Sequence, residues 1–264
     1  MKLCRYSTAA GPMLGRIVDA MIVPVAGDAF GTLRDDGAAI PLAGAQLLPP
    51  VIPSTFFCAG LNYRHHIEEA QRRGVAAKVP ERPDVGYRAN NALIGHDADI
   101  VKPYDCTGDF EYEGELVAVI GRDLRRVSRS EAADGIFGWT IGNDVSARAW
   151  QRSDRTLWRA KNSDTFKPMG PWIDTAAEPM QSETRVFVNG ALSSSCETGD
   201  MIFSAIDFIV EITRYVTMRA GDVLWLGTDA IGPMAPGDTV EVEITKLGRL
   251  RNRVVAEAAP SPRA

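Results

Sequence analysis

The segment from residue 109 to residue 121 constrains the fold of this chain more than any other stretch. Its first half carries acidic side chains at every second position, namely Asp109, Glu111, Glu113 and Glu115. Its second half, from Leu116 to Gly121, is apolar. Successive side chains of an extended chain point to opposite faces, so the four carboxylates are expected on one side. The segment therefore predicts a β-strand that carries acid on one face.

Four carboxylates so close together repel one another, and something must offset that repulsion. Solvent, basic partners, shared protons or a hard divalent cation with oxygen ligands would each do so. A solvated edge strand with acidic residues explains the same pattern without any metal. The segment alone leaves these alternatives open.

Length and charge limit the classes of protein to consider. A chain of 264 residues fits one large β-rich domain, or a small domain and a large one. The net charge of -5, with no basic run, gives no support to nucleic acid or an anionic membrane as a partner. No apolar stretch approaches the length of a membrane span, and the N-terminus lacks the apolar core of a signal peptide. We therefore expect a cytoplasmic protein.

The order of strand and turn signals predicts the domain organisation. Residues 1–50 contain short strand patterns separated by turns rich in Gly, Asp and Pro, which indicates a small N-terminal β domain. Residues 51–256 then form a larger, mainly β (α+β) domain, and residues 257–264 a flexible tail. Within the larger domain, Asn189-Gly190 predicts a hairpin, Ser204 with Asp207 a helix capping box, and residues 161–172 an irregular loop.

A helix is predicted after Gly60, where good helix formers continue to Gly74. His66 and Glu69 are three residues apart in it, so they share a face and the carboxylate is able to orient the imidazole. A surface helix whose polar face carries His, Glu and Arg explains the pattern equally. Further along, residues 138–148 predict a second buried strand that delivers Asp144, although an Asx turn would also place an Asp there.

Taken together, these motifs resemble the fumarylacetoacetate hydrolase family. The matching motifs, in order, are Gly60-Leu61-Asn62-Tyr63 with His66 and Glu69, Glu113-Gly114-Glu115-Leu116, Asn143-Asp144-Val145-Ser146-Ala147-Arg148 with Gln151, residues 161–171, Val188-Asn189-Gly190, residues 199–204, Gly227-Thr228 and residues 250–255. The resemblance covers residues 51–255. It implies a mixed β-sandwich or β-roll core with a small N-terminal β domain, a homodimer, and a divalent metal, Mg2+ or Mn2+.

The resemblance also implies roles for individual residues. The family's metal ligands fall on Glu113, Glu115 and Asp144, so that Asp109 and Glu111 are not ligands. The catalytic residues fall on His66 and Glu69 of a mobile lid and on Lys161. The positions that contact the substrate fall on Tyr63, Arg148, Gln151 and Thr228. Removing Asp144 is then expected to cost little stability in metal-free buffer, because a repelling carboxylate is lost.

These roles imply metal-dependent hydrolysis of a carbon–carbon bond in a 2,4-dioxo acid of the acylpyruvate type, in the catabolism of aromatic compounds or sugar acids. Water held by His66 and Glu69 would attack the distal carbonyl, and Lys161 would stabilise the developing negative charge. An isomerase or decarboxylase acting on a metal-chelated 2-oxo acid is the alternative. A binding module without turnover is a third hypothesis, and it would leave His66 and Glu69 dispensable.

The chain departs from the family pattern at a few positions. It has Ala149 where relatives commonly carry Asp, Asp229 where they carry Pro, and Tyr87-Arg88 where they often carry Phe and Lys. Asp229 places a negative charge close to the expected distal pocket. A second carboxylate on the substrate would then need a cation such as Arg64, Arg88 or Arg159. The identity of the substrate stays open.

Overall fold

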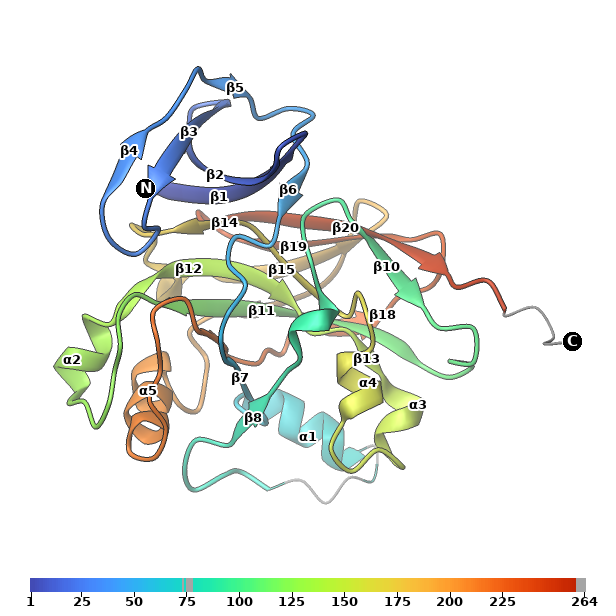
Figure 1. The fold of residues 1–264 in the computed structure, drawn as a ribbon. Coiled ribbons are helices and arrows are strands. Elements are labelled where there is room, and N and C mark those ends of the chain that lie inside the picture. Colours follow the sequence, from blue (N-terminus) through green and yellow to red (C-terminus); the bar gives the residue numbers. More distant parts are fainter. Residues whose placement is uncertain (73, 75–77, 260–264) are drawn as a thin grey trace, which may run out of the picture.

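The computed structural model describes residues 1–72, 74 and 78–259, and most of its regular structure is strand (Figure 1). The strands are β1 (Lys2–Thr8), β2 (Gly11–Val18), β3 (Met21–Gly27), β4 (Leu33–Asp35), β5 (Ile40–Pro41), β6 (Leu47–Leu48), β7 (Phe56–Ala59), β8 (Val85–Tyr87), β9 (Leu93–Ile94), β10 (Asp99–Lys102), β11 (Phe110–Ile120), β12 (Ile136–Asn143), β13 (Ser146–Ala147), β14 (Lys167–Asp174), β15 (Glu183–Val188), β16 (Ala191–Glu197), β17 (Val223–Trp225), β18 (Ile231–Pro233), β19 (Thr239–Ile244) and β20 (Gly248–Ala256). The helices are α1 (Arg64–Arg72), α2 (Arg129–Ala133), α3 (Arg148–Gln151), α4 (Trp158–Asn162) and α5 (Ala205–Thr213), with 3-10 turns η1 (Asn90–Ala92) and η2 (Pro179–Gln181). The mainly β fold class predicted from the sequence is confirmed.

Two sheets make up the fold. In the larger sheet the main path runs β4-β3-β2-β1-β14-β12-β11-β17-β7-β8, and in the smaller it runs β10-β20-β19-β15-β16. Strands β15, β19 and β20 contact β11, β12 and β14, so the two sheets pack face to face. The main apolar core lies between them.

The N-terminal strands extend the larger sheet, because β1 pairs antiparallel with β14. They enclose a small apolar core of their own, formed by Cys4, Tyr6, Ile22 and Leu47. Figure 1 shows this part in blue, above β14. The domain boundary at residue 50 stays a prediction. Of the predicted tail, residues 257–259 have no regular structure, and residues 260–264 lie outside the described residues.

Strand β11 is buried along its whole length, which explains how it carries both acid and core residues. Leu116 and Ala118 belong to the core between the sheets, whereas Val117 and Val119 belong to a second core on the opposite face. Gly114 lies against the smaller sheet, where an added Cβ would come within 2.8 Å of Val186 and Val242. Since side chains alternate, the three glutamates of β11 face away from the smaller sheet.

Local sequence signals account for several of these elements. Ser128 and Ser204 form capping boxes at α2 and α5, and Asn189 and Gly190 both have positive φ in the turn between β15 and β16. The irregular loop predicted for residues 161–172 is wrong, because α4 covers its start and β14 its end. Pairing of β14 with β1 and β12 outweighs the turn-forming residues of that segment.

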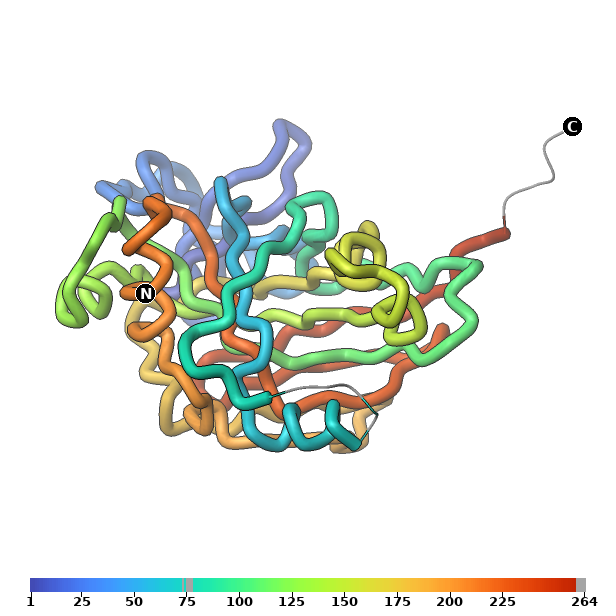
Figure 2. Tube along the Cα trace, turned by 90° about the horizontal axis from the view of Figure 1, so that it is seen from below, coloured from blue at the N-terminus to red at the C-terminus, as the bar shows by residue number. Residues whose placement is uncertain are grey.

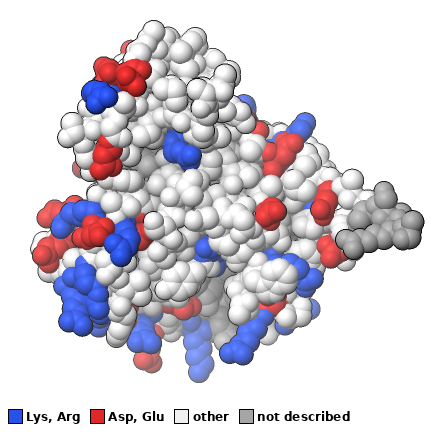
Figure 3. Space-filling model, viewed as in Figure 1, with Lys and Arg blue, Asp and Glu red and all other residues white. Residues whose placement is uncertain are grey.

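Helices α1, α3 and α4 lie on the side of β11 and β12 that faces away from the smaller sheet (Figures 1 and 2). Figure 3 shows acidic and basic side chains interspersed over the described surface of this view. Within the described residues, no helix is both long enough and apolar enough to cross a membrane.

Candidate metal and active site

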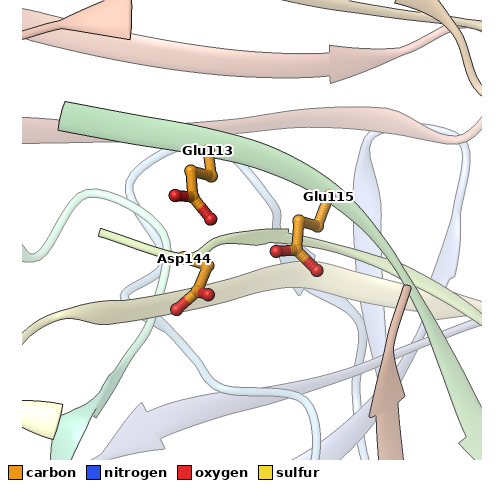
Figure 4. A group of neighbouring side chains, drawn as sticks. All are labelled: Glu113, Glu115 and Asp144. Atoms are coloured by element: carbon orange, nitrogen blue, oxygen red, sulfur yellow. The ribbon is translucent and has the colours of Figure 1, made fainter. Parts of the chain in front are cut away.

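Three buried carboxylates from two neighbouring strands meet at the centre of the molecule (Figure 4). Glu113 and Glu115 come from β11, and Asp144 follows the end of β12. The register of the two strands puts Gly114 opposite Asn143, and the Asp144 amide donates to the Glu113 carbonyl at 2.9 Å. One oxygen from each carboxylate lies within 4.8 Å of the others. These are the three residues that the family resemblance selects, whereas Asp109 is exposed.

Asp144 is surrounded by cations. Arg88 donates from Nε and Nη2 to its two oxygens at 3.2 and 2.9 Å. Lys161 Nζ lies 2.9 Å from Oδ2, and Lys167 Nζ lies 2.6 Å from Oδ1. Burial works to raise the pKa of Asp144, but these cations outweigh it and hold the pKa well below its usual value.

Glu113 shares one of these cations and has another of its own. Lys161 Nζ lies 2.7 Å from its Oε2, and Arg148 forms an ion pair with Oε1. Burial opposes ionisation here as well, but Lys161 and Arg148 bring the pKa of Glu113 down to about 2. Arg148 also donates to Glu111 at 2.6 Å and to Gln151 at 3.2 Å, so each of its three side-chain nitrogens donates to a neighbouring side chain.

Glu115 differs from the other two carboxylates. The Gly227 amide donates to it at 2.8 Å, and among the described residues no Lys or Arg forms an ion pair with it. Burial, together with the charges of Asp144 and Glu113, raises the pKa of Glu115 to about 8. A divalent cation would supply the missing positive charge. Three carboxylates without nitrogen or sulfur donors suit Mg2+ or Mn2+, so the residues present fit the metal that the resemblance implies.

One cavity adjoins the carboxylates, and a second cavity lies next to the first. The inner chamber, of about 310 Å3, is lined by Glu113, Glu115 and Asp144 together with His66, Arg88, Arg148, Gln151, Lys161 and Thr228, among others. The outer chamber, of about 400 Å3, is lined by Leu61, His66, Glu69, Ala70, Arg148, Gln151, Arg152, Leu157 and Ile231. Leu61, His66, Arg148, Gln151 and Leu157 line both, so the two chambers lie side by side.

Most of the residues predicted for the site line one of these chambers, and Tyr63 does not. Tyr63 is 2% exposed, and its hydroxyl donates to the Thr198 carbonyl at 2.7 Å. Asn62, beside it, donates to the carbonyls of Phe203 and Leu226 at 3.1 and 2.9 Å. These bonds fix the chain just before α1, so Tyr63 anchors the start of the helix.

His66 lies where the two chambers meet. Its Nδ1 atom is buried and has no hydrogen-bond partner among the described residues. Burial is the largest influence on its pKa and lowers it, although the charge of Glu113 acts in the opposite direction. The imidazole is therefore neutral at neutral pH and able to accept a proton. Glu69, one turn further on, lines the outer chamber and accepts a hydrogen bond from Arg72 Nε at 2.8 Å.

Sequence reasoning missed two cations of the site. Lys167, which is 0% exposed, lies on a segment predicted to be irregular, and its burial had no local signal. Arg88 was noted as a departure from the family pattern and as a candidate partner for a distal carboxylate, yet it forms an ion pair with Asp144. Arg159, considered as a partner for a distal carboxylate, lies over the Trp150 ring at 4.3 Å.

Comparisons with known proteins agree with this fold. A family model described as fumarylacetoacetate (FAA) hydrolase, C-terminal, matches residues 55–255, and one described as Rv2993c-like, N-terminal, matches residues 1–50. The oxaloacetate tautomerase YisK of Bacillus subtilis is 35% identical over 78% of this chain and 71% of its own length. A structure titled 2-hydroxyhepta-2,4-diene-1,7-dioate isomerase, from Mycobacterium marinum, is 36% identical with a TM-score of 0.86, covering 98% of this chain and 100% of the other. A fumarylacetoacetate hydrolase structure from Exiguobacterium antarcticum is 30% identical with a TM-score of 0.83, covering 97% and 100%.

Proposed function

Because the chain belongs to the fumarylacetoacetate hydrolase family, we propose that it is a divalent-metal-dependent enzyme that moves a proton on a 2-oxo acid, as a tautomerase or isomerase. The observation that carries this proposal is that His66, whose pKa is lowered by burial, lines both chambers. From the family resemblance we also propose a homodimer and a cytoplasmic location.

Glu113, Glu115 and Asp144 would hold the metal, which is Mg2+ or Mn2+ on the chemistry of the donors. When bound, the metal would act as a Lewis acid that makes the carbon next to the 2-oxo group more acidic. Lys161 keeps Glu113 and Asp144 close together, since its Nζ contacts both. Thr228 Oγ1 accepts from the Ala230 amide at 2.9 Å, which fixes this part of the inner chamber wall.

The charges around the inner chamber favour an anionic ligand. Four carboxylates (Glu111, Glu113, Glu115 and Asp144) face four cations (Arg88, Arg148, Lys161 and Lys167). With all four carboxylates ionised, as metal binding requires, the cluster is balanced, so a divalent cation would leave it with an excess of positive charge. A 2-oxo acid brings a carboxylate and a polarised carbonyl oxygen, which offset that excess.

His66 is placed to move the proton. Its neutral imidazole would take a proton from the carbon beside the 2-oxo group and return it to the same carbon, to oxygen, or further along the chain. Return to oxygen is tautomerisation, and return along an unsaturated chain is isomerisation.

Hydrolysis of a carbon–carbon bond is the second candidate. Glu69 shares a helix face with His66 and lines the outer chamber, where a water held by the pair would meet a distal carbonyl. The isomerase structure matches as much of this chain as the hydrolase structure does and at higher sequence identity, and a neutral His66 is sufficient for isomerase or tautomerase chemistry. We therefore place proton transfer first.

A panel of oxaloacetate, acetylpyruvate and an unsaturated 2-oxo diacid, followed by NMR with and without Mg2+, tests the proposal. We expect metal-dependent keto–enol interconversion or a double-bond shift, slowed roughly 100-fold or more by His66→Ala. The matched control is His65→Ala, because His65 is exposed and lines neither chamber. Cleavage of acetylpyruvate as the main reaction, lost in Glu69→Gln, would instead establish the hydrolase.

A further inference from the structure

The outer chamber has a distal end that the carboxylate cluster does not reach. Glu69, Ala70, Arg152 and Ile231 line the outer chamber and not the inner one. A ligand whose head lies against Glu113, Glu115 and Asp144 would therefore meet these residues with its other end. Their chemistry bears on which substrates fit, so this inference rests on the proposed function.

Arg152 is the cation at this distal end. It follows the last residue of α3, four positions after Arg148, so the two arginines lie on the same side of one helical turn. Arg148 contacts Glu113 at the inner chamber, and Arg152 lies one turn, roughly 5.4 Å, further out. Figure 1 shows α3 on the same side of β11 as α1 and α4, which contribute the facing walls.

The other charges of the outer chamber are engaged. Arg148 donates to Glu111, Glu113 and Gln151, and Glu69 accepts from Arg72. Arg152 is exposed, and among the described residues no carboxylate forms an ion pair with it. Asp229, expected from the sequence to repel a second carboxylate, does not line the outer chamber. A cation without a counter-charge thus faces the distal end of the bound ligand.

Apolar side chains separate the two ends. Leu61 and Leu157 line both chambers, and Ala70 and Ile231 line the outer one. They would contact the carbon chain between a 2-oxo acid head and a distal group. We propose that Arg152 is a specificity-determining residue that binds a second carboxylate, so that the preferred substrates are 2-oxo diacids with an apolar spacer between the two acid groups.

Calorimetric binding to the Mg2+-loaded protein tests this without requiring turnover. The probes are 2-oxoadipate and 2-oxohexanoate, which have chains of equal length and differ in the distal carboxylate. We expect the wild type to prefer the diacid by roughly tenfold or more, as for a charge-assisted hydrogen bond. Arg152→Gln should bring the ratio close to one by weakening the diacid alone, and Arg152→Lys should restore part of it. Added salt should reduce the preference, because Arg152 is exposed.

The matched control is Arg155→Gln, since Arg155 is an exposed arginine on the same segment that lines neither chamber. It should keep the wild-type ratio. An unchanged ratio in Arg152→Gln, with both acids still bound, would overturn the role of Arg152 and leave the proposed function standing. Binding of neither acid by the wild type would overturn the proposed function and this inference with it.

Discussion

The three carboxylates of the site have different neighbours, and those neighbours decide what each one does to stability. Asp144 contacts Arg88, Lys161 and Lys167, and Lys167 is completely buried. Burial lowers the pKa of Lys167 to about 8, while Asp144 helps to keep it charged. Glu115 contacts no cation among the described residues. Removing the Asp144 carboxylate therefore affects stability differently from removing the Glu115 carboxylate.

This difference leads to a prediction for metal-free protein. Asp144→Asn should lower the free energy of unfolding by about 3–5 kcal/mol, because it leaves buried cations without their counter-charge. Glu115→Gln should change it by less than about 1 kcal/mol, since an amide oxygen still accepts the Gly227 amide. Urea unfolding with a chelator present measures both, and calorimetry should show that both variants lose Mn2+ binding. Equal destabilisation of the two variants, or Mn2+ binding retained by either, would contradict this assignment.

The alternating acidic residues predicted the acid face of β11. They did not predict the cations that neutralise the carboxylates. Alternation put Glu113 and Glu115 on one side, and the family resemblance added Asp144. The expectation that losing Asp144 costs little stability considered repulsion alone, and the three cations around Asp144 lead us to predict the opposite. Arg88 and Lys167 come from segments far away in the sequence, and tertiary structure alone brings them to Asp144.

At the scale of elements, α1 and α5 are a natural comparison. Both span nine residues, but α5 has a capping box and five buried residues, whereas α1 buries only Ile67. The helix predicted from Gly60 to Gly74 is present from Arg64 to Arg72, and residue 73 lies outside the described residues. The run of good helix formers predicted where α1 lies. That α1 buries so few side chains is seen only in the three-dimensional structure. An element with few buried contacts moves at a small cost in free energy.

We predict that α1 acts as a lid. Hydrogen exchange in residues 64–72 should slow markedly when Mg2+ and oxalate are added together, because closure over the inner chamber buries the helix. Residues 205–213 of α5, which line neither chamber, are the internal control and should change little. Equal protection of α1 with and without oxalate would show that it is a fixed wall.

For the whole molecule, two sheets hold the site rigidly from one side. Strand β11 is buried on both faces, the smaller sheet packs behind it, and the acid face opens toward α1, α3 and α4. Alternation and turn signals predicted β11 and the mainly β class, although they did not predict β14. They did not predict that β1 continues the larger sheet through β14, because that pairing joins residues about 170 positions apart. Such long-range pairing depends on packing, which local sequence patterns do not encode.

A metal-held 2-oxo acid would lie beside the neutral imidazole of His66. Solvent isotope exchange tests that arrangement most directly. Oxaloacetate incubated with the protein in D2O, corrected for spontaneous exchange, should gain deuterium at the carbon beside the 2-oxo group. The gain should require Mg2+, stop on chelation, and fall roughly 100-fold or more in His66→Ala while His65→Ala keeps the wild-type rate. Deuterium uptake no faster than the spontaneous rate, or equally fast in His66→Ala, would contradict proton transfer by His66.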